Sequence, residues 1–154
     1  MAGLTSAIPG AITALLGHLA TIAATYTDPQ LQVIDGDLGT NVLPAFVQIG
    51  NATGWVQEAV DLGNFRRDER FDLEGIIQWF DGGAGAEVAS QVRADAFAIL
   101  EAVVLAITAD PTLGGSVMFA QCTGGGAMEQ GTTANGGWSV IVPFQVHCQA
   151  QLQR

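Results

Sequence analysis

The side chains with the clearest potential for chemistry lie in the segment Asp35-Gly36-Asp37-Leu38-Gly39-Thr40-Asn41. Oxygen-bearing side chains at alternating positions are typical of calcium loops, and an Asp-x-Asp pair after a strand is typical of some phosphohydrolases. The twelfth position of a calcium loop should carry a bidentate glutamate, but Phe46 stands there. A polar turn between two strands is the simpler prediction, and an Asp35/Asp37 phosphohydrolase stays open as an alternative.

The histidines, cysteines and glycines do not form a recognisable catalytic motif. His18 and His147 have no metal-ligand spacing, so we expect no metal site. His147 and Cys148 are neighbours in a predicted strand, and their side chains would therefore point to opposite faces. The triplet Gly124-Gly125-Gly126 is not followed by Lys-Ser or Lys-Thr, which excludes the usual phosphate-binding loop. We therefore expect a protein that is not an enzyme and has no cofactor.

The charge of the chain limits its partners. Fifteen Asp and Glu residues against five Arg and no Lys give a net charge of −10. This balance argues against binding to nucleic acid phosphates or to anionic membranes. An acidic surface can instead repel DNA and let it pass, although solubility alone is an equally good reason for the acidity. Met1–Gly10 lacks a basic leader region, and no uninterrupted apolar run of about 18 residues follows, so we expect cytoplasmic synthesis and no membrane span.

Two segments have apolar residues at helical spacing. Pro9–Tyr26 begins with a proline, which suits the first helical position, and should end at the residue before Pro29. Ala86–Thr108 should end before Pro111 and Gly114-Gly115. The buried stripe of this second helix is predicted to contain Val88, Val92, Ala96, Leu100, Val103, Val104 and Ile107.

Other segments have the pattern of strands. Apolar and polar residues alternate along Phe71–Phe80 and Gly137–Leu152, which is typical of strands with one buried side. Pro143 within the second run predicts an edge position or a bulge. Shorter strands are predicted at Leu31–Asp35, at Ala45–Ile49 closed by Gly50-Asn51, at Trp55–Phe65 and at Ser116–Cys122.

The order of these elements predicts the fold class. A helix, several strands, a second helix and two strands indicate an α+β fold, with a mixed, largely antiparallel sheet packed against two main helices. At 154 residues the chain is most simply a single domain spanning 1–154.

Two segments are candidates for contacts between subunits or with partner proteins. The first is a mixed-charge cluster at the start of a strand, where guanidinium groups could pair with carboxylates of a neighbour. The second is the glycine-rich segment Thr123–Gly137, which is long for a hairpin loop. The candidate contact residues are Arg66, Arg67, Asp68, Glu69, Arg70, Gly124, Gly125, Gly126, Met128 and Glu129.

Several motifs, in their order and spacing, resemble the tail terminator proteins of long-tailed bacteriophages, also called minor tail or tail completion proteins. The resemblance extends over most of residues 8–152. It is carried by Arg93–Ala96, Ile99–Val103 and Asp110–Gly115, and further by Val33–Gly36, Val47–Gly50, Arg67–Phe71 and Val142–Val146.

The resemblance implies a structural virion protein made in the host cytoplasm and located at the neck-proximal end of the tail. Such proteins form a homo-oligomeric ring, commonly a hexamer, that stops polymerisation of the tail tube and provides the head–tail joining surface. The implied partners are the tail tube protein and head–tail connector proteins, with genomic DNA passing through the lumen without specific binding. Another head–tail connector, a tail tube subunit and a small-ligand binding domain stay open as alternatives.

Overall fold

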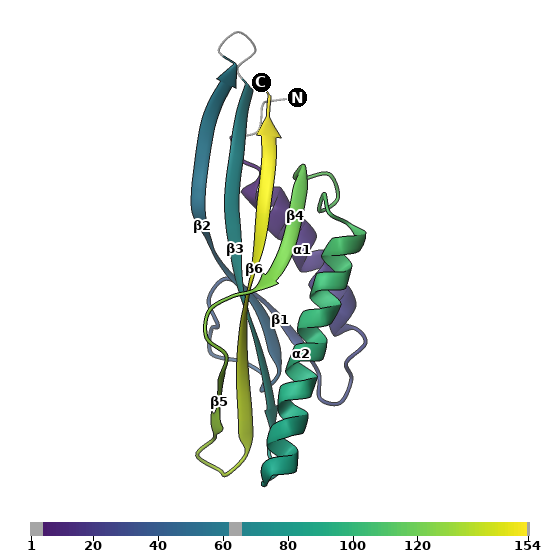
Figure 1. Ribbon diagram of the computed structural model, residues 1–154. Helices are drawn as coiled ribbons and strands as arrows, with labels where there is room; N and C mark the ends of the chain where they lie inside the picture. The colour runs from purple at the N-terminus through teal and green to yellow at the C-terminus, as the bar shows by residue number, and fades with distance from the viewer. Residues whose placement is uncertain (1–4, 62–65, 154) are drawn as a thin grey trace.

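The computed structural model describes residues 5–61 and 66–153, which form two helices and one six-stranded sheet (Figure 1). The predicted α+β class is therefore confirmed. Among the described helices, neither has the length and apolar character needed to cross a membrane. The elements are α1 (Ile8–Ala23), β1 (Gln32–Asp35), β2 (Phe46–Asp61), β3 (Arg66–Asp81), α2 (Ala86–Ala109), β4 (Phe119–Gly124), β5 (Glu129–Thr132) and β6 (Trp138–Leu152).

The sheet is mixed and largely antiparallel, as predicted. Its strand order is β1-β2-β3-β6-β4, and β5 also pairs with β6. Only β1 and β2 run parallel; every other pair is antiparallel. The strands β3 and β6 pair along their whole lengths, from Arg67 opposite Leu152 to Asp81 opposite Trp138. These two long strands therefore form the centre of the sheet.

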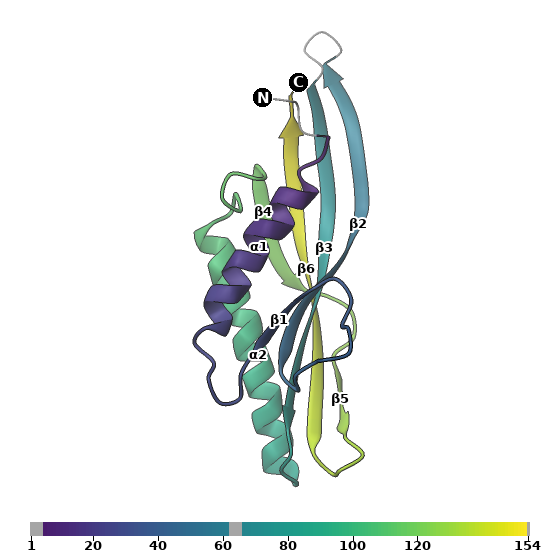
Figure 2. The ribbon, with the colours of Figure 1, turned by 180° about the vertical axis from the view of Figure 1, so that it is seen from behind.

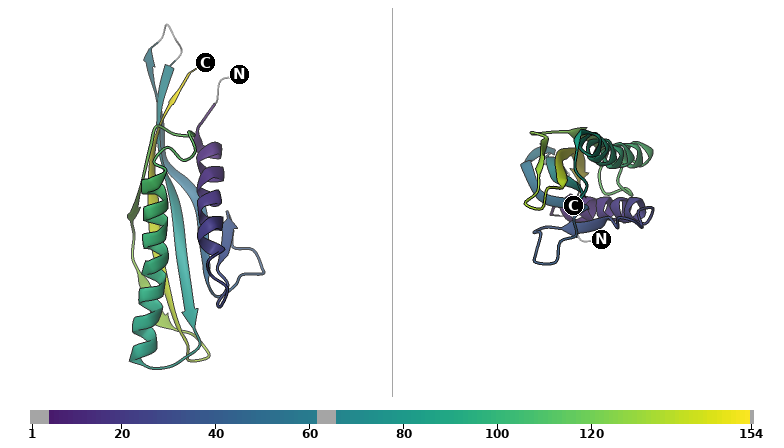
Figure 3. Two further views of the ribbon diagram at one scale, coloured as in Figure 1. Left: turned by 90° about the vertical axis from the view of Figure 1, so that its right-hand side faces the viewer. Right: turned by 90° about the horizontal axis from the view of Figure 1, so that it is seen from below.

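The sheet is long, strongly twisted and covered on one face. In Figure 1 its strands cross one another at mid-length, as expected for long strands with a right-handed twist. Both helices lie on the same face, side by side (Figure 2), and Figure 3 shows this helical layer from the side and from below. The strands β2 and β3 extend beyond both helices at one end of the molecule.

The core lies between the helices and this covered face. Phe71, Leu73, Ile77 and Trp79 of β3 are buried, and every second residue of β6 from Val140 to Leu152 is buried, whereas the residues between them are partly or fully exposed. Period-two burial therefore confirms the predicted faces of both strands. The helix α2 buries Ala89, Val92, Ala96, Ile99, Val103 and Ile107, whereas the predicted Val88, Leu100 and Val104 are only partly buried.

A glycine is required in the middle of the covered face. Gly75 of β3 lies opposite Phe144 of β6, and the phenyl ring of Phe144 packs over the glycine. A Cβ atom at position 75 would lie 2.2 Å from the Cζ atom of Phe144. The large and small side chains of this pair are therefore complementary.

The prediction that Gly50-Asn51 ends a strand is wrong. The strand β2 continues to Asp61, and its register against β3 shifts between Ile49 and Ala52. The two residues are accommodated as a β-bulge because β3 continues as a partner on the other side of the irregularity. The predicted Trp55–Phe65 strand is part of the same element as far as Asp61, and its last four residues lie outside the described part of the chain.

The strand predicted at Ser116–Cys122 begins later, at Phe119. Leu113, Gly114 and Gly115 all have positive φ angles and form turns after α2. Asp110 closes these turns by accepting hydrogen bonds from the backbone nitrogen of Gly114 and from His18 Nε2, at 2.9 and 2.8 Å. The turn segment between α2 and β4 is thus longer than Pro111 and the Gly114-Gly115 pair indicate in the sequence.

The segment Thr123–Gly137 is not a single loop, and Pro143 is not at a sheet edge. Residues 129–132 form β5, which pairs with the first part of β6, whereas β4 pairs with its second part. The carbonyl of Pro143 accepts a hydrogen bond from Gly125 N at 3.2 Å. The proline nitrogen points to the same side, where residues 125–128 leave the sheet between β4 and β5, so its missing N–H removes no ladder hydrogen bond.

Candidate functional site

The charged cluster Arg66–Arg70 forms the start of β3, between β2 and β6. Arg67 lies opposite Ala59 of β2 and Leu152 of β6, and Glu69 lies opposite Gln57 and Ala150. The backbone of the cluster is therefore inside the sheet, and alternate side chains point to its two faces.

Glu69 is fully buried within the protomer and lies outside the surface that a second subunit could reach. Its carboxylate accepts hydrogen bonds from Ala7 N, Ser6 Oγ and Trp55 Nε1, each at 2.7 Å, and from Gln57 Nε2 at 3.0 Å. Burial acts to raise the pKa of Glu69, but these four hydrogen bonds outweigh it and hold the pKa below its usual value. Its predicted place in an exposed contact cluster is therefore corrected to an internal, satisfied anion.

The other members of the cluster are more accessible. Arg67 donates to Gln57 Oε1 at 3.2 Å and so extends the network around Glu69. Asp68 accepts from Gln151 Nε2 at 3.1 Å. Arg70 and Glu58 form a loose pair at 3.5 Å in which both side chains are 61% exposed. Such a pair contributes little to stability and leaves Arg70 available to a partner.

The glycines Gly125 and Gly126 form one wall of a hollow of about 350 Å³. The hollow lies on the face of the sheet opposite the helices, between this glycine wall and the bulge of β2 at Gly50-Asn51. Gly124, the last residue of β4, lies just before the wall. The remaining lining residues are Gln48, Glu74, Gly75, Ile76, Pro143, Phe144 and Gln145.

Met128 and Glu129 are exposed, as expected for contact residues, and the segment after them is tethered to α2. Gln130 Nε2 donates to the carbonyl of Ala89 at 2.7 Å, and Arg93 donates to Gln130 Oε1 at 2.8 Å. The predicted contact residues thus fall into two groups, one at the start of β3 and one between the end of β4 and the start of β5, of which Gly125 and Gly126 line the hollow. A contact of either group with another subunit stays a prediction.

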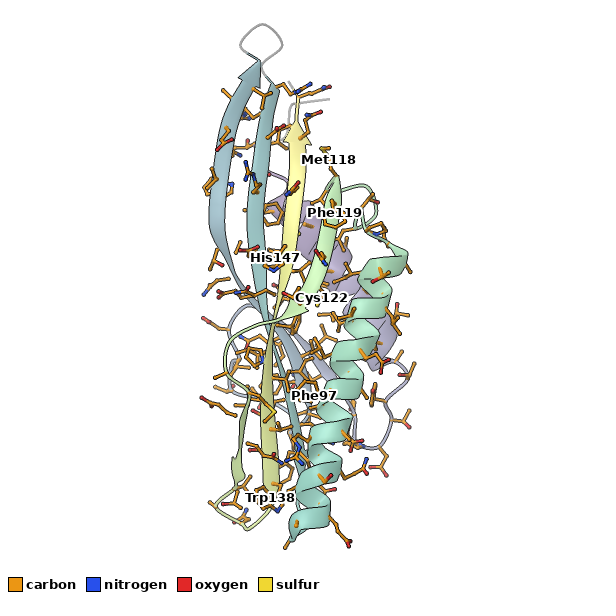
Figure 4. All side chains as sticks on the ribbon, viewed as in Figure 1. Phe97, Met118, Phe119, Cys122, Trp138 and His147 are labelled. Atoms are coloured by element: carbon orange, nitrogen blue, oxygen red, sulfur yellow. The ribbon has the colours of Figure 1, made fainter. Side chains whose placement is uncertain are left out.

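A hydrogen-bonded chain of three side chains, which the sequence does not predict, joins β3, β6 and β4. His147 of β6, labelled in Figure 4, contacts Asp72 of β3 through Nδ1 at 2.5 Å and Thr123 of β4 through Nε2 at 3.0 Å. The order hydroxyl, imidazole, carboxylate is the one used by nucleophilic hydrolases. Alternation placed His147 on the polar face, but no local signal indicates that β3 and β4 are its neighbours.

The acidic turn and the cysteines show no assembled site. Asp35 and Asp37 are both exposed. In residues 5–61 and 66–153, no three His, Cys, Asp or Glu side chains are placed to hold one metal ion. Cys122 and Cys148 are free and buried, and burial raises the pKa of their thiols to about 11 and about 12. The phosphohydrolase alternative stays an untested prediction.

Comparisons with known proteins give no family. No protein-family model matches the chain, and no curated protein matches it. Among solved structures, the chain is similar to one described as "Virion of native gene transfer agent (GTA) particle", with 11% sequence identity and a TM-score of 0.34. The similarity covers 88% of this chain and 84% of that chain. A similarity of this strength carries no argument about the function of this chain.

Proposed function

We propose that this chain is a structural virion protein that assembles into a ring through the two edges of its sheet. The observation that carries the proposal is the free edge of β2. Among the described residues, β1 pairs only with Phe46–Ile49, so the outer edge of β2 from Ala52 to Asp61 has no partner strand. Long edge strands with exposed apolar side chains are templates for pairing with another chain. Trp55, Val56 and Val60 on this strand are 55%, 49% and 46% exposed.

The opposite edge of the sheet differs from this one. It consists of β4 and β5, which both pair with β6. A contact between two different surfaces of identical subunits is heterologous, and it closes into a ring when the rotation between subunits permits. A hexameric ring, as the sequence resemblance implies, is compatible with this arrangement.

The finer role that we propose is that of a tail terminator. The ring would bind the last ring of tail tube protein at the head-proximal end, stop its polymerisation and provide the joining surface for connector proteins. The face opposite the helices has Asp72, Glu74 and Gln145 at mid-length, and by alternation along β3 it also carries Arg70. The acidic part of this face around Asp72 and Glu74 would not hold DNA phosphates, which suits a passage for the genome.

Native mass spectrometry of variants with lysines introduced on the free edge of β2 tests the ring. We expect a hexamer for the natural chain and monomers for the double variant Val56→Lys plus Val60→Lys, because lysines at an edge oppose strand pairing. The double variant Leu38→Lys plus Leu43→Lys is the matched control, since these side chains are 43% and 37% exposed but lie outside β2. A natural chain that stays monomeric even when mixed with tail tubes contradicts the proposal. Long tubes formed by the chain alone would indicate a tail tube subunit instead.

The chain Thr123–His147–Asp72 favours one second candidate, a threonine-dependent hydrolase of esters. In that reaction the Thr123 hydroxyl would attack the ester carbonyl, His147 would take the hydroxyl proton and pass it to the leaving alcohol, and water would then release the acid. Turnover of p-nitrophenyl acetate that is lost in Thr123→Val and His147→Gln would support this candidate. Equal rates for the natural chain and both variants would reject it.

A further inference from the structure

The hollow opposite the helices has a wall that is fixed by backbone geometry. Gly126 has a φ of +85°, which side-chain-bearing residues rarely adopt, and a Cβ atom there would lie 3.2 Å from Pro143 Cγ. A Cβ atom at Gly125 would lie 3.3 Å from Gln145 Cδ. A side chain at Gly125 would crowd Gln145, and one at Gly126 would be strained by the positive φ, because the glycine segment approaches the sheet closely and leaves its backbone beside the hollow.

The side chains around the hollow can accept hydrogen bonds and attract a positively charged group. Glu74 is the one charged residue among those that line it, and Gln48, Asn51 and Gln145 add side-chain amides. Thr53 Oγ1 donates to Glu74 Oε1 at 3.3 Å, a long hydrogen bond that leaves much of the carboxylate's capacity to accept. Ile76 and Pro143 supply apolar surface between these polar groups.

We infer that this hollow receives an arginine side chain from another protein of the assembly. The guanidinium group would pair with Glu74 and donate to neighbouring amide oxygens, because its planar fork offers five donors in fixed directions. The aliphatic stem of the arginine would pack against Ile76 and Pro143, as long basic side chains do on apolar surface. Lysine fits less well, since a single ammonium group cannot reach acceptors spread along the rim.

The occupant belongs to another protein of the assembly, because none of the described arginines of this chain lines the hollow. Arg67 donates to Gln57 and Arg93 donates to Gln130, and both are thereby held away from it. A volume of about 350 Å³ is near the lower end of the range of roughly 300–1,000 Å³ for ligand pockets, which suits one side chain better than a peptide. The inference rests on the proposed function in one respect: a role in virion assembly makes the occupant a side chain of a protein and not a free small molecule.

Methyl NMR with N-acetyl-L-arginine methylamide as the probe tests the site. We expect saturable shifts of the Ile76 methyl signals and none at Ile34, which is buried and does not line the hollow. Glu74→Gln should weaken binding about tenfold, the usual effect of losing a charged hydrogen-bond partner. Asp35→Asn removes the same charge from an exposed position outside the hollow and should leave the affinity unchanged within about twofold.

Three outcomes overturn the inference. They are the absence of saturable shifts at Ile76, equal affinities of the natural chain and Glu74→Gln, and equal binding of N-acetyl-L-glutamine methylamide. The spectrum of each variant also reports whether it is folded, and Gly126→Ala provides a second variant that narrows the hollow without changing its charge. The titration uses whichever oligomer the protein forms in solution. A failure to bind the arginine probe can therefore be distinguished from a failure to form the ring, which native mass spectrometry measures.

Discussion

The carboxylate of Glu69 lies 2.7 Å from the backbone nitrogen of Ala7, a residue 62 positions earlier at the start of α1. This helix has no side-chain cap at its N-terminus and no acidic residue in its first turn. Glu69 of β3 therefore supplies both the hydrogen-bond acceptor and the negative charge that a helix N-terminus favours. The same carboxylate binds Trp55 and Gln57 of β2, so one anion joins the helix to two strands.

Replacing Glu69 by glutamine should destabilise the fold. The side-chain amide would direct its own N–H groups at surrounding donors, and the buried donors that lose a charged acceptor would stay unpaired. We expect the free energy of unfolding to fall by about 1–3 kcal/mol, measured by urea denaturation. Glu58→Gln is the control, since Glu58 is exposed, and it should change stability by less than about 0.5 kcal/mol. Equal losses in the two variants would contradict this role of Glu69.

Acid should weaken the same link. The pKa of Glu69 is lower in the folded chain than in the unfolded chain, so the unfolded chain binds more protons as the pH falls. This contribution is complete above the ordinary glutamate pKa of about 4.3 and is lost as the pH falls through the lower folded value. Urea midpoints measured from pH 7 to pH 3 should therefore decrease at the acidic end. The decrease should be smaller in Glu69→Gln. The loss of stability that persists in this variant would include the contribution of Asp110, whose pKa is lowered by hydrogen bonds from Gly114 N–H and His18.

The pair of Gly75 and Phe144 should behave as one packing unit. Gly75→Ala places a methyl group where the phenyl ring lies, and we expect a loss of about 1–3 kcal/mol from overpacking. Phe144→Leu should restore part of that loss in the double variant, as a double-mutant cycle of unfolding free energies would show. Gly17→Ala in α1 is the control: apart from the helix's own backbone and the two neighbouring residues, no atom lies within 4 Å of its added Cβ, so it should stabilise the helix by about 0.5–1 kcal/mol. Additive losses in the Gly75–Phe144 cycle would refute the coupling.

The tether of β5 to α2 should depend on Gln130. Gln130→Ala removes the bonds to Ala89 and Arg93, and we expect amide hydrogen exchange in β5 to become about three- to tenfold faster. Gln121→Ala, at an exposed position of β4, should leave the exchange of β5 unchanged. Unchanged exchange in Gln130→Ala would mean that pairing with β6 alone holds this strand.

The best-predicted features are the buried faces of individual strands and helices, because each follows from the periodicity of one continuous segment. The alternation in Phe71–Phe80 and Gly137–Leu152 identified the buried faces of β3 and β6, because one face of each is covered by helices. It also placed His147 on the polar face. The stripe of α2 was predicted with an offset, since Ile99 is buried where Leu100 was expected, and the direction of the neighbouring strand decides such choices.

Features that depend on pairing between distant segments were not predictable in this way. Gly50-Asn51 reads locally as a strand end, and only the presence of β3 opposite makes it a bulge. Pro143 reads locally as an edge residue or a bulge. The edge alternative is wrong because β4 and β5 lie beside β6 in tandem, whereas the break in pairing at the proline fits the bulge alternative. Glu69 reads as part of a solvated cluster, because three of its four donors come from residues that are more than 12 positions away.

The central place of β6 also sets an order of events during synthesis. This strand is the last of the described elements to leave the ribosome, and both β3 and the pair β4–β5 need it as their neighbour. Until it emerges, β1, β2 and β3 can form one mixed unit, with β1 parallel and β3 antiparallel to β2, whereas β4 and β5 have no strand to bind. The nascent chain therefore presents the future centre of its sheet as an open edge along β3. Any premature contact between two growing chains would be expected at that strand, and completion of β6 would remove the opportunity.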